Sequence, residues 1–487
     1  MRNRIFLLKA LLLAVLTSYA QIAEVDETVT EGKIKSHIYF LASDALRGRD
    51  TGSPELDIAA EYIASRFREY GVEPVNGSYF QDVPFKKVTP PNQGVVTTGD
   101  LTLAVGDDVL LLDGSNGSWD QDMVYVGYGT EEDFKKKQVE GKIVVALCGS
   151  KGEQDPRSWT RLSAEKKKRV TTYGATGLIE LYNSTKVPWS LLVRYLHGER
   201  TVLDKGGDGV LHLWVNDSNN ERAATFDQKK ATVSIKVDGM KVQRFNSKNV
   251  VGIVPGTDPD LKEEYMMYSA HYDHVGVGAP NDEGDSIYNG SRDNAVGSVT
   301  VLAMAENLAK YPTKRSSLFV LFTAEEIGLL GSQYAADNPI IPLDQVVYCF
   351  NSDNGGYNDT SLATIIGLPR TTADQEIIKA CDAYGLKAVD DPAPEQGLFD
   401  RSDNVNFAKK GVPAPTFSMG FTAFDEEIGK YYHQQTDNPE TLDYDYLVKF
   451  FKSYVYAGRL IADRDARPFW VEGDKYYETG KALYKQP

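Results

Sequence analysis

The chain has little cysteine and, after its first twenty residues, no long apolar run, and both scarcities exclude classes of protein. Only three cysteines occur among 487 residues, too few for the disulfide framework of a small secreted domain. Cys148 and Cys349 fall in apolar, β-rich runs, so both are expected to be buried thiols. No apolar stretch after residue 20 approaches the length of a membrane span. Stability must therefore come from large hydrophobic cores, and two domains are expected at this length.

Positive charge is also in deficit. The chain has 53 Lys and Arg residues against 69 Asp and Glu, a formal net charge of −16. Binding to nucleic acid or to an anionic membrane needs a basic face, so neither partner is expected. The one basic cluster, KKKR at residues 166–169, predicts only an exposed helix.

Residues 1–20 have the pattern of a secretory signal. Arg2 and Arg4 precede an apolar stretch, and the small-residue run Ser18-Tyr19-Ala20 resembles a cleavage site. A membrane anchor is the alternative, but the stretch is short and Lys9 interrupts it. The sequence therefore predicts a secreted or periplasmic protein that leaves the membrane once the signal is removed.

The rest of the chain divides into three stretches by the pattern of its elements. Residues 21–94 begin with two amphipathic helical patterns, at 32–40 and 57–70. Residues 95–244 carry short strands separated by Gly and Asp turns. From 245 to 487 strands alternate with helices, which predicts an α/β fold with a mixed, mostly parallel sheet flanked by helices. Residues 95–244 are then an insertion between the two parts of that α/β domain.

Two adjacent glutamates, Glu325 and Glu326, follow the apolar run at residues 318–323. Such a run predicts a buried central strand, and open α/β sheets place their sites at strand ends. One carboxylate of such a pair can bind a metal ion while the other transfers protons. The alternative is that both acids only form the favourable first turn of a following helix.

Other segments place a histidine or an acid in the same setting. His271 ends a hydrophobic strand, and Asp273, two residues on, is expected on the same side, where it can accept the second ring N–H of His271. Asp293 precedes a helical pattern, Asp353 ends a β-rich run and His433 lies in a loop. Two histidines with three carboxylates suit two Zn²⁺ ions that share one bridging acid.

The strings AHYDHVG, NGSRDNAVGS, FTAEEIGLLGS, NSDNGG and YYHQQTDNP occur in this order, and the series resembles the motifs of the di-zinc aminopeptidases of peptidase family 28. Near the N-terminus, LASDALRGRDTGSPELDIAAEYIASRFREYGVEP resembles that family's first segment. The run RSDNVNFAKKGVPAPTFSMG resembles a segment that precedes the family's last histidine. In the insertion, VEGKIVVALCGS and YGATGLIELY resemble the protease-associated domain that some members carry.

The resemblance implies the zinc exopeptidase fold, two Zn²⁺ ions per chain and a role for each candidate residue. Glu325 would be the general base, a choice that the residues alone leave open. A cis peptide bond is expected between Asp293 and Asn294. The inserted domain would narrow access to the metal cleft; the alternative is a spacer or a partner-binding module. The implied ligands are Asp293 as the bridge, His271 and Asp353 on one ion, and Glu326 and His433 on the other.

The resemblance indicates a secreted hydrolase that cleaves the N-terminal bond of peptides. Three alternatives stay open: a carboxypeptidase or dipeptidase of the same fold, a glutaminyl cyclase with one zinc ion, and a non-catalytic peptide-binding receptor. A carboxypeptidase needs a cation for the substrate carboxylate, and Arg292 or Arg401 could supply it. An aminopeptidase needs an acid near the free amine, and Asp403 or Glu395 could serve.

Overall fold

The computed structural model describes residues 19–152, 156–184, 186–206, 209–227 and 231–485. The chain forms two compact units: unit 1 comprises residues 1–83 and 246–487, and unit 2 comprises residues 84–245. The first boundary lies earlier than the expected 94/95, because strand β1 (Phe80–Thr89) continues from unit 1 into unit 2. Most of the predicted signal, residues 1–18, lies outside the described residues.

Unit 1 has the predicted α/β architecture around a mixed sheet. Its strands follow the order β16-β15-β17-β14-β12-β13-β11. Strand β12 runs parallel to β13 and β14, and β14 runs parallel to β17. Only β11 and β15 run antiparallel to a neighbour, against β13 and β17. The strands are β11 (Lys241–Val254), β12 (Tyr265–His271), β13 (Ser316–Phe322), β14 (Val346–Ser352), β15 (Leu362–Ile366), β16 (Lys387–Val389) and β17 (Thr416–Met419).

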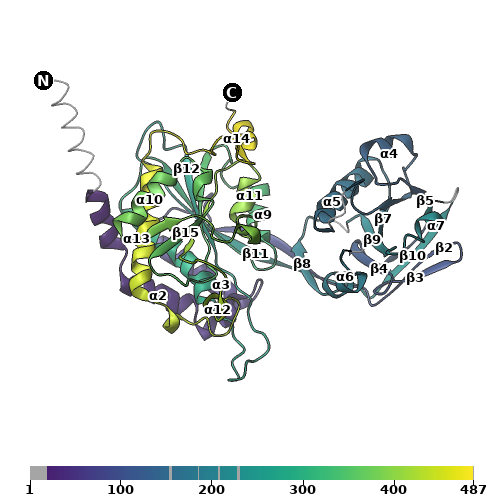
Figure 1. The fold of residues 1–487 in the computed structure, drawn as a ribbon, viewed down its shortest axis with the longest axis horizontal. Coiled ribbons are helices and arrows are strands. Elements are labelled where there is room, and N and C mark those ends of the chain that lie inside the picture. The colour runs from purple at the N-terminus through teal and green to yellow at the C-terminus, as the bar shows by residue number, and fades with distance from the viewer. Residues whose placement is uncertain (1–18, 153–155, 185, 207–208, 228–230, 486–487) are drawn as a thin grey trace. The chain divides into compact units, whose positions relative to one another are not determined.

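Helices cover both faces of this sheet, with α10 and α13 on one side and α9 and α11 on the other (Figure 1). Successive residues of β13 point to opposite faces, as the pleat requires. Phe319 and Leu321 join one core, whereas Leu318 and Val320 join the other. The helices of unit 1 are α2 (Glu31–Leu41), α3 (Pro54–Tyr70), α8 (Gly297–Lys310), α9 (Leu330–Asp337), α10 (Asp374–Ala383), α11 (Asn404–Ala408), α12 (Glu426–Gly429), α13 (Tyr444–Ala462) and α14 (Tyr477–Leu483).

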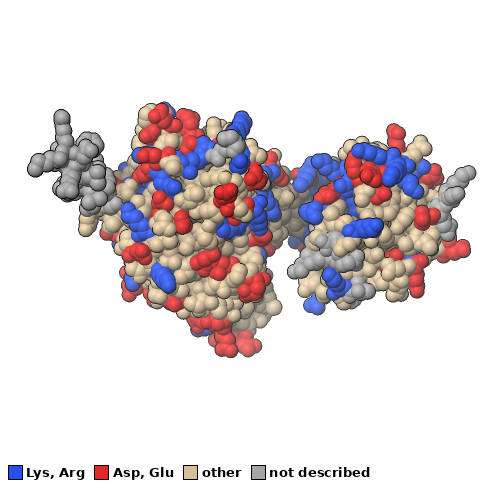
Figure 2. Space-filling view, turned by 45° about the horizontal axis from the view of Figure 1, so that its top comes forward, with Lys and Arg blue, Asp and Glu red and all other residues tan. Residues whose placement is uncertain are grey.

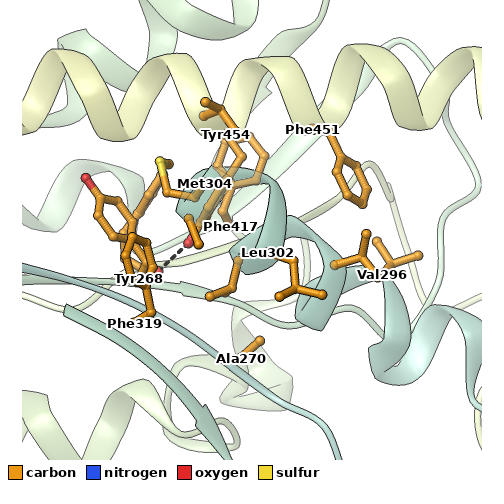
Figure 3. Close-up of a cluster of buried hydrophobic side chains, with 14 of the residues drawn as sticks. Tyr268, Ala270, Val296, Leu302, Met304, Phe319, Phe417, Phe451 and Tyr454 are labelled. Carbon is orange, nitrogen blue, oxygen red and sulfur yellow. Dashed lines mark hydrogen bonds between the residues drawn. The ribbon is translucent and has the colours of Figure 1, made fainter. Parts of the chain in front are cut away.

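The larger core lies between the sheet and helices α8 and α13. Figure 3 shows Phe451 and Tyr454 of α13 facing Leu302 and Met304 of α8. The rings of Tyr454 and Phe350 stack with centroids 4.6 Å apart, a contact that adds to the energy of burial. This packing holds α8 and the central strands together, and those elements carry the site described below.

Unit 2 is built around a second sheet, in the order β3-β2-β10-β5-β6-β7-β9-β4. The pairs from β5 through β6 and β7 to β9 are parallel, while the remaining pairs are antiparallel. Strand β1 pairs with β8 apart from this sheet. The elements are β2 (Gln93–Thr98), β3 (Leu101–Ala104), β4 (Val109–Asp113), β5 (Gly117–Tyr125), α4 (Glu131–Lys136), β6 (Ile143–Leu147), α5 (Pro156–Thr172), β7 (Gly177–Tyr182), α6 (Trp189–Leu196), β8 (Arg200–Leu203), β9 (Leu211–Asn216), α7 (Ala223–Phe226) and β10 (Thr232–Asp238).

The basic cluster at residues 166–169 lies on helix α5, but the expectation that it is entirely exposed is wrong. Lys166 is 2 % exposed, and its Nζ lies 2.7 Å from Oε1 of Glu180, which is fully buried. His212 and Trp214 donate to the other oxygen of Glu180, at 2.8 and 3.1 Å. The carboxylate of Glu180 stabilises the buried ammonium group, a partner on another strand that a local sequence pattern does not reveal.

Surface charge and thiols agree with the composition. Lys and Arg side chains are mixed with Asp and Glu over the surfaces that Figure 2 shows. Cys148, Cys349 and Cys381 are all buried free thiols, which confirms the expectation for the first two. Within the described part of the chain, no helix has the length and apolar character needed to cross a membrane.

Candidate metal centre

Four of the candidate residues lie at the carboxyl ends of neighbouring strands. His271 is the last residue of β12, Glu325 and Glu326 follow β13, and Asp353 follows β14. Because these strands are parallel neighbours, their carboxyl ends share one edge of the sheet, where open α/β sheets bind ligands. The strand order therefore brings together residues that are far apart in the sequence.

Asp293 lies between two histidines that come from different parts of the chain. Its Oδ1 is 3.3 Å from Nε2 of His271, and its Oδ2 is 3.1 Å from Nε2 of His433. Nε2 of His271 is also 3.3 Å from Oδ1 of Asp353, and Nε2 of His433 is 3.1 Å from Oε2 of Glu326. The peptide bond between Asp293 and Asn294 is cis, as expected. Oδ1 of Asp293 thus faces the pair of His271 and Asp353, and Oδ2 faces the pair of His433 and Glu326.

The electrostatics of this cluster favour positive charge. Burial acts to raise the pKa of Asp293, but hydrogen bonds with His271 and His433 lower it well below its ordinary value. Burial acts to lower the pKa of His433, yet the carboxylates of Asp293 and Glu326 raise it to about 10. Several buried acids therefore share few protons, which is the setting in which a divalent cation binds.

Asp273 has a different contact from the one expected. Nδ1 of His271 lies 3.2 Å from the main-chain oxygen of Asp273 but 3.8 Å from its carboxylate. The chain leaves the strand after His271, so the two-residue spacing no longer aligns the side chains. The carboxylate instead accepts the backbone N–H groups of Glu325 and Glu326, at 3.2 and 3.4 Å, and the hydroxyl of Thr51 at 3.1 Å. Asp273 therefore orients the two glutamates.

Glu325 is one of several acids here whose protonated form burial favours. Burial raises its pKa well above the ordinary value; His271 opposes this shift, and the carboxylates of Asp353, Asp403 and Glu326 add to it. Glu325 and Glu326 thus differ, because the pKa of Glu326 is lowered: burial raises it, but hydrogen bonds with His274 and His433 outweigh burial. Paired acids whose pKa values are driven apart divide acid–base and ligand roles.

The sequence analysis missed His274, although it stands in the same string as His271. His274 is 1 % exposed, and its Nδ1 lies 2.6 Å from Oε1 of Glu326. Its imidazole belongs with Asp293, Glu326 and His433 to a group whose ligand atoms lie within 4.8 Å of one another. Since Oε1 of Glu326 is engaged by His274, its Oε2 is directed to His433.

Arg49 and Asp437 were also missed, although Arg49 stands in the string LASDALRGRDTGSPELDIAAEYIASRFREYGVEP and Asp437 in the string YYHQQTDNP. Arg49 is 1 % exposed, and its guanidinium donates to the carbonyl oxygens of Tyr272, Asn289 and Gly290, at 2.8, 2.7 and 3.0 Å. It therefore ties together the two loops that carry His274 and Asp293. Burial lowers the pKa of Arg49 to about 10, still well above neutral, so the side chain remains a cation.

Arg292 braces the site and does not line its pocket, in contrast to the expected contact with substrate. Its Nη1 lies 2.8 Å from Oδ1 of Asp437, and its guanidinium lies over the ring of Tyr431 at 3.6 Å. Oδ2 of Asp437 in turn accepts the backbone N–H groups of Arg292 and Asp293, at 2.8 and 3.3 Å. The pair fixes the backbone at Asp293, because one carboxylate holds both residues.

The other substrate candidates have different positions. Arg401 is exposed and lines the pocket over the cluster, whereas Asp403 is fully buried and does not line it. Burial raises the pKa of Asp403 to about 7. Glu395 is exposed and outside the pocket. Of these residues only Arg401 is placed where it can touch a molecule in the pocket.

The pocket has one polar and one apolar wall and a volume of about 110 Å³. His271, Asp293 and the two glutamates form the polar wall. A hydrophobic side chain would be shielded from water against the apolar wall. Its residues are Ile366, Leu398, Phe421, Phe424, Ile428 and Tyr432.

The donor set fits zinc. Imidazole nitrogens and carboxylate oxygens are ordinary zinc ligands, and the buried acids supply the negative charge that offsets the ion. His274 contacts the carboxylate of Glu326, and the carboxylate of Asp437 accepts the backbone N–H of Asp293; both contacts orient the ligands, as partners around zinc ligands do elsewhere.

Comparisons with known proteins agree with this geometry. Residues 249–457 match the model of peptidase family M28. The chain is 26 % identical over 412 residues to aminopeptidase YwaD of Bacillus subtilis, a match that covers 82 % of this chain and 78 % of that protein. It is 27 % identical over 220 residues to leucine aminopeptidase 2 of Trichophyton equinum, across 43 % of this chain and 41 % of that one. The crystallised aminopeptidase from Aneurinibacillus sp. strain AM-1 shares the fold with a TM-score of 0.52 at 21 % identity, over 92 % of this chain and 97 % of that one. All the candidate ligands lie inside residues 249–457, the region that matches peptidase family M28.

Proposed function

We propose that this chain is an aminopeptidase that binds two zinc ions and removes N-terminal residues from peptides. The observation that carries the proposal is the position of Asp293, whose two carboxylate oxygens face separate pairs of histidine and acid. His271 and Asp353 would hold one ion, and His433 and Glu326 the other. The similarity to characterised aminopeptidases supports the same activity.

Zinc bound in this cluster supplies a Lewis acid that polarises the peptide carbonyl and makes water a stronger nucleophile near neutral pH. Glu325 takes a proton from the attacking water and gives it to the leaving amine. Burial raises the pKa of Glu325 in the metal-free cluster, and two bound cations would lower it again, towards the range in which a carboxylate can accept a proton. Asp273 keeps Glu325 in place through the backbone N–H.

The pocket supports a preference for a hydrophobic first residue. Its apolar wall is lined by two phenylalanines, Phe421 and Phe424, with Ile366 and Ile428. Burying such a side chain against them contributes about 25 cal/mol per Å². The site acids would attract the free amine of the substrate.

A dipeptidase or carboxypeptidase is the second candidate, and Arg401 is the observation that favours it. Arg401 lines the same pocket, where it can face a substrate carboxylate. Peptides blocked at the amine and peptides blocked at the carboxyl terminus separate the two functions. Hydrolysis that requires a free amine and tolerates a C-terminal amide supports the aminopeptidase.

The decisive experiment pairs a metal count with one substitution. Purified enzyme should bind two equivalents of zinc and release the chromophore from leucine p-nitroanilide. Glu325→Gln should keep both ions but lose about 10²–10⁴-fold in kcat. Glu395→Gln, the same change at an exposed residue outside the pocket, is the control and should keep full activity. Near-normal kcat in Glu325→Gln, or one zinc at saturation, would refute the proposal.

Export and the inserted domain complete the proposal. Residues 1–20 would direct export and then be removed; N-terminal sequencing of the protein recovered outside the cytoplasm should find a start close to residue 21.

Unit 2 would be a protease-associated domain, an assignment supported by the strings VEGKIVVALCGS and YGATGLIELY. Removing unit 2 and comparing leucine p-nitroanilide with longer peptides tests whether it restricts the substrate.

A further inference from the structure

Unit 2 contains a groove that has no part in the chemistry proposed above. It has a volume of about 740 Å³ and lies entirely among residues 86–242. Residues of β8 and β4 line it together with the start of β11, and we call it the β4–β8 groove. Its wall and floor include Lys86, Leu111, Lys167, Arg200, Val202 and Val242.

The floor of the groove is one face of the β1–β8 pair. Lys86 pairs with Val202, and Val88 pairs with Arg200. All four line the groove, as expected for residues two apart on a pleated strand. Lys87 lies between Lys86 and Val88, forms an ion pair with Glu199 at 2.6 Å and does not line the groove.

Two strand edges border the groove. Among the described strands, β4 pairs with β9 at the end of its sheet, and β8 pairs with β1 and is likewise terminal. The edge of β4 is partly covered, because Nη2 of Arg200 donates to the carbonyl oxygens of Leu112 and Leu111, at 2.8 and 3.4 Å. The edge of β8 has no strand partner among the described residues. An unpaired edge is a template for another strand.

The register shows which groups of β8 are free for such pairing. The backbone N–H of Asp204 donates to the carbonyl of Pro84, at 2.9 Å, just beyond the last strand pair of Phe85 and Leu203. Hydrogen-bonded and non-bonded pairs alternate in an antiparallel ladder. Arg200 and Val202 therefore bond to β1, so the N–H and C=O groups of Thr201 and Leu203 point to the open edge.

The groove is strongly cationic for a chain of net charge −16. Lys86, Lys167, Arg200 and Lys205 line it, and Asp113, which is paired with Lys167, is the one acid among the described residues of the lining. Among the residues that the structure describes, neither Lys86 nor Lys205 forms an ion pair. Asp204 is next to Lys205 in the chain, and its carboxylate binds Arg244 at 2.8 Å. A carboxylate ligand would therefore find unpaired cations there.

Thr171 and three glycines also line the groove, and the other lining residues that the structure describes are apolar without an aromatic ring: Val88, Leu111, Leu112, Val202, Leu203, Val210, Met240 and Val242. Single-stranded nucleic acids are bound chiefly by positive grooves with aromatic rings for stacking, so the lining does not suit them. Apolar residues and cations side by side suit a strand with alternating apolar and acidic side chains.

We propose that the β4–β8 groove binds an extended peptide segment with alternating acidic and apolar residues, which adds as a strand to the open edge of β8. Main-chain hydrogen bonds to Thr201 and Leu203 hold the peptide in place. Lys86 and Lys205 face its carboxylates, and Val88 and Val202 of the floor receive its apolar side chains. The groove is a binding site outside the metal centre, on the inserted unit.

The test uses the full chain and a fluorescein-labelled peptide of alternating Glu and Val, acetylated and amidated so that an exopeptidase does not cleave it. Fluorescence anisotropy should show saturable binding that weakens with salt and at least tenfold weaker binding of the Lys–Val analogue. Lys86→Glu should weaken binding at least tenfold. Lys87→Glu, the matched change on the other face of β1, should alter it less than twofold.

A second variant tests strand addition itself. Thr201→Pro removes a backbone N–H that faces the open edge, not β1, so the fold is expected to persist and peptide binding to be lost. Hydrolysis of leucine p-nitroanilide should stay unchanged in all three variants. Equal affinity for the two peptides, unchanged binding in Lys86→Glu or in Thr201→Pro, or tighter binding of single-stranded oligonucleotide would each overturn the proposal. Displacement by millimolar inorganic phosphate would also overturn it, because it indicates a small-anion site.

Discussion

The pairing of Arg292 with Asp437 predicts that a residue outside the pocket controls both stability and metal binding. The two side chains are 3 % and 2 % exposed, and the Nη1–Oδ1 distance is 2.8 Å. Replacing Arg292 by Met keeps much of the apolar volume but leaves the buried carboxylate without its cation. Removing one partner of a buried ion pair costs about 3–5 kcal/mol.

That cost converts to a measurable shift in melting temperature. Domains of a few hundred residues lose about 2–4 °C per kcal/mol, so Arg292→Met should lower the Tm of unit 1 by roughly 6–20 °C. The carboxylate of Asp437 also holds the backbone N–H of Asp293. Zinc affinity should therefore fall as well, by about 10–100-fold, as for other groups that orient a ligand.

The measurement is differential scanning calorimetry of the zinc-free chain, followed by zinc titration against a competing chelator. The matched control is Lys410→Met, which breaks the exposed pair of Lys410 and Asp337, whose side chains are 42 % and 44 % exposed. Exposed pairs contribute about 0–1 kcal/mol, so this variant should shift the Tm by only a few degrees. The reasoning fails if Arg292→Met melts within 2 °C of the parent and binds zinc equally well.

Three further predictions concern other buried contacts. His274→Phe keeps a ring but removes the 2.6 Å contact with Glu326, so zinc affinity should fall about 10–100-fold in a chelator competition; unchanged affinity would contradict the role given to His274. Burial acts to raise the pKa of Glu180, but His212 and Lys166 lower it from 4.5 to about 2. The ionised carboxylate therefore stabilises the folded state by on the order of 3 kcal/mol. This contribution is complete above pH 4.5 and is lost as the pH falls through 2. Urea unfolding should show a shallower pH dependence in this window when Glu180→Gln is combined with Lys166→Met, and an unaltered slope would exclude this assignment. Gly290 has φ +58, and a Cβ there would lie 2.1 Å from the main-chain oxygen of Asp293. Gly290→Ala should therefore lower the free energy of unfolding by at least about 1–3 kcal/mol in the same urea measurement. A stability equal to that of the parent would show that the loop adjusts to the added methyl group.

The arrangement of the strands was predictable because the apolar runs are long and alternate with helical patterns. The run at 318–323 became β13 (Ser316–Phe322), and the helical patterns at 32–40 and 57–70 became α2 and α3. Histidines and acids directly after such runs were expected at one edge of the sheet, and the parallel order β14-β12-β13 places them there. These inferences depend on residues close in sequence, which is why they succeeded.

The errors concern partners that are distant in sequence. Arg292 was one of two candidate cations for a substrate carboxylate, but in the structure Asp437 and Tyr431 engage its guanidinium. Lys166 was expected at the surface, but Glu180 on β7 holds it inside unit 2. The sequence shows which residues are neighbours along the chain. The position of a long cationic side chain depends instead on which carboxylate the fold brings close to it in space.

The two buried arginines beside the site explain how so many acids coexist in it. Arg292 binds one carboxylate, Asp437, which holds the backbone of Asp293. Arg49 binds carbonyl oxygens, and no carboxylate of the site accepts a hydrogen bond from it. Its charge still acts on Asp273, Asp293 and the other acids at longer range. A protein cation inserted between the acids would compete with a metal ion, whereas cations held behind the loops steady the acids and leave their oxygens free to bind one.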